Sequence, residues 1–144
     1  DLIHRFFEIY FMNPALLEKG FQSLPKALNL NEITTQVEPM LQSYQAWLNS
    51  SLKPTNIQCE LPILAINELG QTVSGSIDML VESEEGFWII DHKTDKKTDF
   101  TKHAEQLKAY AQALNLNKPI MGVAINWVRV GQIESLKINE KNRT

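Results

Sequence analysis

This sequence of 144 residues has few cysteines, no long apolar run and no signal peptide pattern. Cys59 is the only cysteine, so an internal disulfide is impossible, and we interpret it as a small packed residue in a reducing compartment. The sequence contains no apolar run long enough to cross a bilayer, and its first residues lack the pattern of a signal peptide. We therefore expect a cytoplasmic location and no membrane partner.

An excess of positive charge is also missing. The 17 acidic residues outnumber the 14 basic ones, which gives a formal net charge of −3. This balance argues against a protein that grips duplex DNA by charge alone. It does not argue against a site built from carboxylates, because a bound metal ion offsets their charge locally.

The length and composition predict one compact domain over residues 1–144. Hydrophobic residues make up 43% of the sequence, an ordinary value for a globular protein, and there is no internal repeat. The chain begins at Asp1 rather than Met, inside a segment that we expect to be helical. We therefore expect this domain to be a piece of a larger protein.

Hydrophobic periodicity predicts an α/β fold. Spacing typical of helices occurs at residues 1–18, 34–50 and 101–114. In the second of these, Thr34 or Thr35 is the expected N-cap and Pro39 is expected within the first turns. Alternating or apolar runs predict strands at residues 57–66, 72–81, 87–93, 120–130 and 133–138. This order favours a central mixed sheet flanked by helices, with the first three strands as an antiparallel meander.

Two aspartates and a lysine are predicted to converge on this sheet. Side chains two residues apart on a strand share a face, so Asp91 and Lys93 project together, while His92 points the other way. Asp78 lies on the preceding strand, which a tight turn brings alongside. Its carboxylate is thus expected to approach that of Asp91.

Such a cluster is costly without a cation. Like charges repel at close range, and burial penalises each of them. A hard divalent ion relieves both costs, and Mg²⁺ prefers oxygen ligands while keeping waters that can act as a nucleophile. Lys93 would then position or deprotonate that water, or stabilise charge on a phosphate. The alternative interpretation is a surface ion pair between Asp91 and Lys93 on an edge strand, because D-x-K alone is a weak signal.

Several motifs together resemble the PD-(D/E)XK nuclease superfamily, specifically the RecB/AddA-like nuclease domains at the C-termini of bacterial DNA helicases. The resemblance spans nearly the whole chain and keeps the order of the family. The matching pieces are Leu2-Ile3-His4-Arg5-Phe6-Phe7-Glu8, Glu60-Leu61-Pro62-Ile63, Gly75-Ser76-Ile77-Asp78, Ile90-Asp91-His92-Lys93-Thr94 and Gln106-Leu107-Lys108-Ala109-Tyr110.

The resemblance implies a restriction-endonuclease-like core and a Mg²⁺-dependent, exonuclease-type deoxyribonuclease of DNA recombination and repair, with Mn²⁺ able to substitute. It implies that the metal ligands are His4, Asp78, Asp91 and the backbone carbonyl of His92. It implies that Lys93 is the catalytic lysine. Gln106 and Tyr110, four apart on one helix face, would line the site and orient the lysine or the DNA backbone. The implied partners are DNA and a helicase domain or subunit.

Some alternatives remain open in the sequence. Glu60 is either a solvated strand residue or a functional one, and His103 is expected on the surface. His92 stands where the family often has an aromatic residue, and no phosphate-binding G-x-x-x-x-G-K-[ST] loop is present, so any ATPase lies outside these residues. A second hypothesis is a catalytically inactive nuclease fold with a DNA-binding or structural role. A nucleotidyltransferase is disfavoured, because Met79 and Leu80 follow Asp78 in place of a D-x-D pair.

Overall fold

The computed structural model of the chain describes residues 30–66, 69–94, 96 and 99–138. The expected first helix at residues 1–18, with His4, lies outside these residues. No helix within them is both long and apolar enough to span a membrane.

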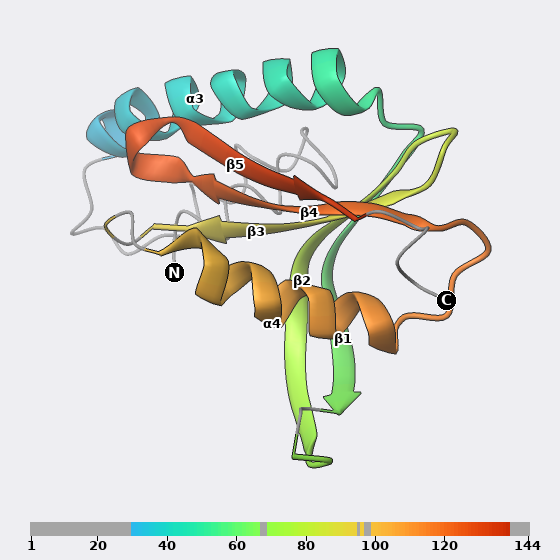
Figure 1. Cartoon of the computed structure of the whole chain (residues 1–144). Helices are drawn as coiled ribbons and strands as arrows, with labels where there is room; N and C mark the ends of the chain where they lie inside the picture. The colour runs from blue at the N-terminus through green and yellow to red at the C-terminus, as the bar shows by residue number, and fades with distance from the viewer. Residues whose placement is uncertain (1–29, 67–68, 95, 97–98, 139–144) are drawn as a thin grey trace.

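The described residues form a five-stranded mixed sheet in the order β1-β2-β3-β4-β5 (Figure 1). Its neighbours pair antiparallel except β3 and β4, which are parallel. The strands are β1 (Asn56–Ile66), β2 (Thr72–Glu82), β3 (Phe87–Lys93), β4 (Ile120–Trp127) and β5 (Gln132–Lys137). The predicted meander of the first three strands is confirmed, and the crossover from β3 to β4 is made by a helix, as parallel strands require.

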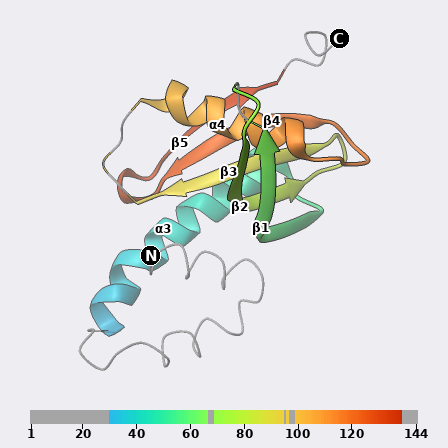
Figure 2. The same cartoon turned by 90° about the horizontal axis from the view of Figure 1, so that it is seen from below.

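Among the described elements, one helix covers each face of the sheet (Figure 1). Helix α3 (Leu30–Trp47) continues into a π-helical turn, η2 (Leu48–Leu52), and helix α4 (Phe100–Ala113) begins after Asp99, whose side chain accepts a 3.0 Å hydrogen bond from the N–H of Thr101. This N-cap satisfies an N–H group that the first turn leaves unpaired. Seen from below, α4 lies across the sheet beside the β1–β2 hairpin (Figure 2).

The predicted start of α3 was wrong. The helix begins at Leu30, four residues before Thr34, so neither threonine is its N-cap, and Pro39 lies in its interior rather than in its first turns. Packing outweighs the cost of that proline, because Leu41, Tyr44 and Leu48 are each no more than 2% exposed against the sheet.

The central strand β3 carries apolar residues on both faces, as its run Phe87-Trp88-Ile89-Ile90 requires. Two buried clusters result, one beneath each helix. The α3-side cluster consists of Leu41, Tyr44, Leu48, Leu52, Met79, Val81, Trp88, Ile90, Ala124 and Val128. The α4-side cluster consists of Ile63, Ala65, Ile77, Leu80, Phe87, Ile89, Ala104, Leu107, Tyr110, Ala111, Ile120, Val123, Ile125 and Trp127. The predicted fold class, a mixed sheet flanked by helices with a restriction-endonuclease-like arrangement, is confirmed.

Strand β1 changes its buried face at Glu60. Cys59 packs with the α3-side cluster, whereas Leu61 and Ile63 pack with the α4-side cluster. Regular alternation would place all three on one side. The change occurs where Glu60 adopts a φ of 52°, a left-handed conformation unusual for a residue other than glycine. As a result, the outer half of the β1–β2 hairpin turns toward α4 (Figures 1 and 2).

Strand β2 changes face at the same level. Ile77 belongs to the α4-side cluster and Met79 to the α3-side cluster, with Asp78 between them. The pairing of β1 with β2 passes from Cys59–Met79 to Leu61–Ile77, so the ladder is interrupted where Glu60 would face Asp78. Asp78 therefore lies at an irregular point of the sheet, the kind of local distortion that re-aims a side chain.

Candidate metal-binding active site

The register of β2 and β3 brings Asp78 to Asp91. Met79 pairs with Ile90, so the antiparallel ladder places Asp78 opposite Asp91 just beyond that pair. The two side chains are close enough for a hydrogen bond between them. The backbone N–H of His92 donates a 2.8 Å hydrogen bond to Oδ2 of Asp78, which fixes that carboxyl against β3. The convergence expected from the hairpin is present.

Burial and the neighbouring carboxyl raise the pKa of Asp91 to about 7, burial being the larger cause. The ammonium of Lys93 acts in the opposite direction and lowers the pKa of Asp91. The Asp91 side chain is only 18% exposed, so water screens this repulsion poorly. The carboxyl pair is therefore held in a state that a bound cation would relieve.

Lys93 forms an ion pair with Asp91, with 3.1 Å between Nζ and Oδ2. The alternative interpretation placed such a pair on an edge strand. That placement is wrong, because β3 is the middle strand of the sheet, between β2 and β4. Lys93 is the last residue of β3 and pairs in register with Trp127, the last residue of β4. It therefore stands where the sheet opens toward solvent, 28% exposed.

A buried polar group lies behind the carboxyl pair, on the α3 side. The ring of His92 is 3% exposed, contacts Tyr44 edge-on with 5.0 Å between ring centroids, and has Nδ1 3.2 Å from the amide nitrogen of Asn126. The hydroxyl of Tyr44 donates a 3.0 Å hydrogen bond to the sulfur of Met79. These contacts tie α3, β2, β3 and β4 together directly beneath the two aspartates. His92 points away from Asp91, as the alternation predicts.

The pKa of the Tyr44 hydroxyl lies well above its ordinary value. Burial is the main cause, and the neighbouring ionisable groups of Cys59 and Asp78 add to it. Asp78 therefore acts on groups on both sides of the sheet: on Asp91 and on Tyr44. This agrees with its position at the point where β2 changes face.

The helix motif packs against β2. The side-chain amide of Gln106 donates a 3.2 Å hydrogen bond to the hydroxyl of Tyr110, and Tyr110 is 7% exposed. A Cβ added at Gly75 would overlap the hydroxyl oxygen of Tyr110, so only glycine leaves room for the ring there. Tyr110 thus contacts the strand three residues before Asp78. It braces that strand against α4.

The donor atoms of Asp78 and Asp91 suit a hard divalent cation, because such ions prefer carboxylate oxygens and relieve the repulsion that raises the pKa of Asp91. Within the part of the chain that the structure describes, no group of three or more His, Cys, Asp or Glu side chains surrounds such a position. The expected ligand His4 lies outside that part. Two carboxylates with waters remain a suitable set for Mg²⁺, which commonly keeps several of its waters.

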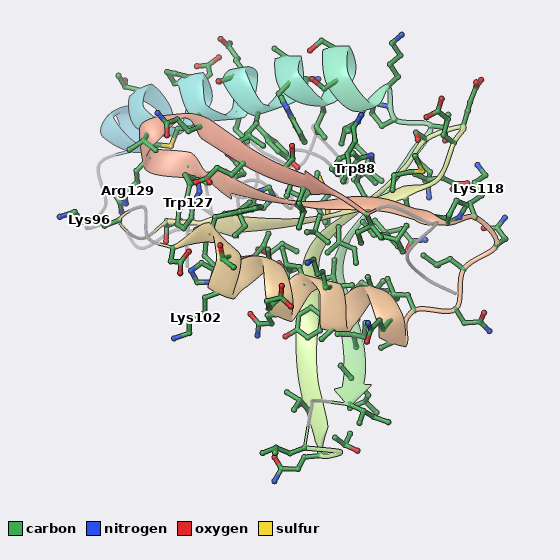
Figure 3. All side chains as sticks on the ribbon, in the orientation of Figure 1. Trp88, Lys96, Lys102, Lys118, Trp127 and Arg129 are labelled. Carbon is green, nitrogen blue, oxygen red and sulfur yellow. The ribbon has the colours of Figure 1, made fainter. Side chains whose placement is uncertain are left out.

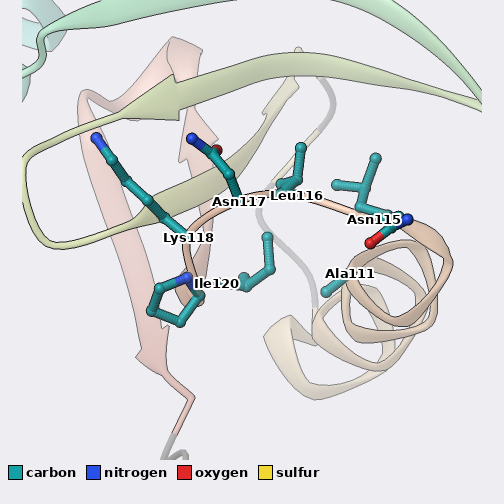
Figure 4. Close-up of a pocket in the computed structure, with 8 residues that line it drawn as sticks. Ala111, Asn115, Leu116, Asn117, Lys118 and Ile120 are labelled. Carbon is teal, nitrogen blue, oxygen red and sulfur yellow. The ribbon is translucent and has the colours of Figure 1, made fainter.

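A depression at the end of α4 lies away from this pair. It has a volume of about 360 Å³ and surrounds the end of α4 and the loop before β4 (Figure 4). Ile120, which lines it, starts β4 and pairs with Phe87 at the far end of β3 from Lys93. Lys118 in this loop is bound to Glu82 at 2.7 Å. The depression therefore plays no part in the carboxylate site.

Comparison with protein families decides the class of the chain. Residues 12–142 match the PD-(D/E)XK nuclease superfamily. The chain belongs to this superfamily. Membership indicates a nuclease that acts on DNA with divalent metal ions, and it covers the strands that carry Asp78, Asp91 and Lys93. The matched residues begin after His4, and no match is found among curated proteins.

Sequence reasoning missed several residues around the site. Asn126 and Tyr44 contact His92 from β4 and α3, and neither had a local motif to mark it. His103 was expected on the surface, but it is half-buried against Trp127, with 5.8 Å between ring centroids. A signal existed for His103: it precedes the apolar stripe of α4 by one residue, which places it at the border of the buried face.

Proposed function

We propose that this domain is a metal-dependent deoxyribonuclease that hydrolyses phosphodiester bonds at Asp78, Asp91 and Lys93. The observation that carries the proposal is the carboxyl pair itself. Two aspartates from adjacent strands are held within hydrogen-bonding range, partly buried, with a lysine 3.1 Å from one of them. Maintaining this cluster costs stability, and perturbed carboxyls of this kind gather at functional sites.

Asp78 and Asp91 would hold the ion, with His4 and the backbone carbonyl of His92 as further ligands. Mg²⁺ is the proposed ion and Mn²⁺ its substitute, since both accept oxygen-rich sites. When bound there, such an ion supplies Lewis acidity toward the phosphate and activates water.

Lys93 would act on the substrate directly. Once Asp91 is engaged by a cation, the ammonium of Lys93 remains beside it at the open end of β3, where a phosphate oxygen can accept its hydrogen bond. A cation placed where negative charge develops stabilises the transition state. The hydrogen bond from the N–H of His92 keeps Asp78 in place, and the contact of Tyr110 with Gly75 positions the strand that carries Asp78.

We further propose an exonuclease-type module of DNA recombination and repair that acts next to a helicase domain or subunit, as in RecB/AddA-like proteins. The motifs quoted above support this, in particular D-H-K-T at residues 91–94 and Q-L-x-x-Y at residues 106–110. The net charge of −3 supports dependence on a partner, because the domain has little overall positive charge with which to hold DNA.

The test is cleavage of DNA by the purified chain. End-labelled linear DNA and closed circular DNA, each single- and double-stranded, are incubated with Mg²⁺, Mn²⁺ or chelator. The proposal predicts metal-dependent cleavage of linear DNA, with circles resistant. An Asp78→Asn variant should be inactive, and a Glu84→Gln variant, altered in the exposed turn before β3, should retain full activity.

Cleavage of circles at the rate of linear DNA would refute the exonuclease mode alone. Absence of cleavage with either ion would leave the metal site to be judged by calorimetry. Mn²⁺ binding that disappears in Asp78→Asn would then support an inactive enzyme with an intact site, and no binding at all would refute the proposal.

A further inference from the structure

Basic side chains gather at the end of the molecule where β3 and β4 finish and α4 begins. Lys96 follows β3, Lys102 lies in the first turns of α4, and Arg129 follows β4. Figure 3 shows the three side chains extending outward at this end, whereas Lys118 lies at the opposite end. We name these three residues the basic edge. It adjoins Lys93, which is the last residue of β3.

Arg129 is held in a defined orientation although it is exposed. Its Nε donates a 2.6 Å hydrogen bond to the backbone carbonyl of Thr94, the residue after Lys93. A guanidinium has five N–H donors in one plane, so this bond uses one of them and leaves the terminal nitrogens for an anion. The short helical turn η3 (Val128–Val130) places Arg129 there directly after Trp127.

The two lysines of the basic edge differ from Lys108 and Lys118 in their partners. Lys108 is paired with Glu105 at 3.2 Å and Lys118 with Glu82 at 2.7 Å. Among the residues that the structure describes, neither Lys96 nor Lys102 forms an ion pair with a carboxylate, and both are exposed. Their charges are therefore available to a ligand.

Three acidic side chains near this end, all in the part of the chain that the structure describes, have local partners. Asp99 accepts the N–H of Thr101 as the N-cap of α4, Glu134 accepts the indole N–H of Trp127 at 2.9 Å, and Asp91 faces Lys93. In addition, the first turn of α4 presents the positive end of its helix dipole next to Lys102. A domain of net charge −3 thus concentrates positive charge beside its carboxylate site.

We propose that Lys96, Lys102 and Arg129 bind the phosphate backbone of the DNA strand next to the scissile phosphodiester and direct that strand onto Asp78, Asp91 and Lys93. The inference rests on the proposed function, since it names the surface by which the same site receives its substrate. Phosphate contacts position a nucleic acid without reading its sequence, so this surface should act on any sequence.

The experiment measures binding separately from cleavage. The variant Lys96→Ala/Lys102→Ala/Arg129→Ala is compared with wild type by fluorescence anisotropy on labelled single- and double-stranded DNA, with Ca²⁺ in place of Mg²⁺, over a series of salt concentrations. Hydrolysis of bis(p-nitrophenyl) phosphate, which is too small to reach the basic edge, reports on the metal site. Lys137→Ala is the control, because Lys137 is exposed and pairs with Gly122, toward the far end of β4 from Trp127.

Loss of three phosphate contacts should weaken DNA binding by about tenfold to a hundredfold and flatten the slope of log affinity against log salt by about 2 to 3. Hydrolysis of the small diester should stay within about twofold of wild type, because the metal site is intact. Arg129→Lys keeps the charge but loses the fixed planar fork. It should therefore keep the wild-type salt slope while binding about threefold to tenfold more weakly.

Wild-type affinity and salt slope in the triple variant would overturn the inference, and so would an equal loss in Lys137→Ala. The DNA form that shows the larger loss identifies the strand that the edge receives. Wild type could hydrolyse no phosphodiester while DNA binding is lost in the triple variant and kept in Lys137→Ala. That result would refute the proposed activity and support the role of the basic edge.

Discussion

The backbone N–H of His92 donates to Oδ2 of Asp78 at 2.8 Å, so the strand that carries Asp91 and Lys93 also holds the carboxyl of the neighbouring strand. The site is thus assembled by backbone geometry as well as by side chains. Asp78 reaches this bond from the point where β2 changes its buried face.

Asp78→Asn should separate the charge of Asp78 from its structural role. The amide oxygen of asparagine can still accept the N–H of His92, so the fold should be retained. The charge that raises the pKa of Asp91 is lost, and that pKa should fall below about 7. Divalent cation affinity should fall by at least about tenfold, since one of two charged ligands is removed. Calorimetric titration with Mn²⁺ and NMR titration of the Asp91 carboxyl measure the two effects, and unchanged values for both would contradict the account.

The metal-free protein should become less stable as the pH rises from about 4 to about 7. In that window the folded state keeps the proton of Asp91, whose pKa is raised from 3.8 to about 7, while the unfolded chain has lost it. Asp91→Asn should lack this component and be more stable than wild type at pH 8, by about 1–3 kcal/mol.

Urea denaturation in chelator at pH 5 and pH 8 measures this difference between the two proteins. Added Mg²⁺ should raise the midpoint of wild type at pH 8 and leave that of Asp91→Asn unchanged, since a ligand stabilises only the state that binds it. A parallel pH dependence of both proteins would mean that Asp91 ionises normally.

Gly75→Ala should displace β2 from α4. The added methyl group meets the hydroxyl of Tyr110, whose side chain is buried. We expect a loss of about 1–3 kcal/mol in the free energy of unfolding, together with lower DNA cleavage, because Asp78 lies three residues further along the strand. Ser74→Ala, an exposed neighbour, should change neither.

A double-mutant cycle tests this contact. Adding Tyr110→Phe removes the hydroxyl and should recover part of the stability lost in Gly75→Ala, so the two substitutions should not be additive. Full additivity would show that the overlap is relieved elsewhere.

Two substitutions at Glu60 should differ in their effect on stability. Glu60 has a φ of 52°, which glycine adopts at no steric cost and a β-branched residue resists. We expect Glu60→Gly to be as stable as wild type or more stable by about 0.5–1 kcal/mol, and Glu60→Val to be less stable by about 1–2 kcal/mol. Thermal unfolding measures both. If Glu60→Gly keeps stability but loses cleavage, the Glu60 side chain, whose Oε2 accepts the hydroxyl of Ser76 at 3.3 Å, has a direct role.

Sequence alone located the strands of the site well. The bounds of β3 agree at both ends with the prediction, because an apolar run between a turn and a polar loop has few alternative lengths. Register then followed from the hairpin, and with it the approach of Asp78 to Asp91. Two predicted boundaries were wrong. Helix α3 begins earlier, at Leu30, and a short helical turn at Val128–Val130 replaces the predicted end of β4.

Local sequence patterns could not predict features that arise where elements distant in the sequence meet. Strand prediction depends on side chains alternating between the two faces, and this alternation breaks at Glu60. The positive φ there has no glycine in the sequence to signal it. The fit of Tyr110 against Gly75 arises only when α4 crosses β2. Asn126 contacts His92 because β3 and β4 pair in parallel. The order of helices and strands in the sequence allowed this pairing but did not specify it.

The most direct test of the central claim is the single-turnover rate of DNA cleavage by Lys93→Ala and Asp91→Ala, each purified and checked for wild-type folding by circular dichroism. Lys137→Ala serves as a matched lysine control. The account predicts that both site variants lose at least about 1,000-fold in rate in Mg²⁺ or Mn²⁺, as expected when groups acting only in the transition state are removed, with Lys137→Ala unchanged. Cleavage by both site variants at the wild-type rate would contradict it.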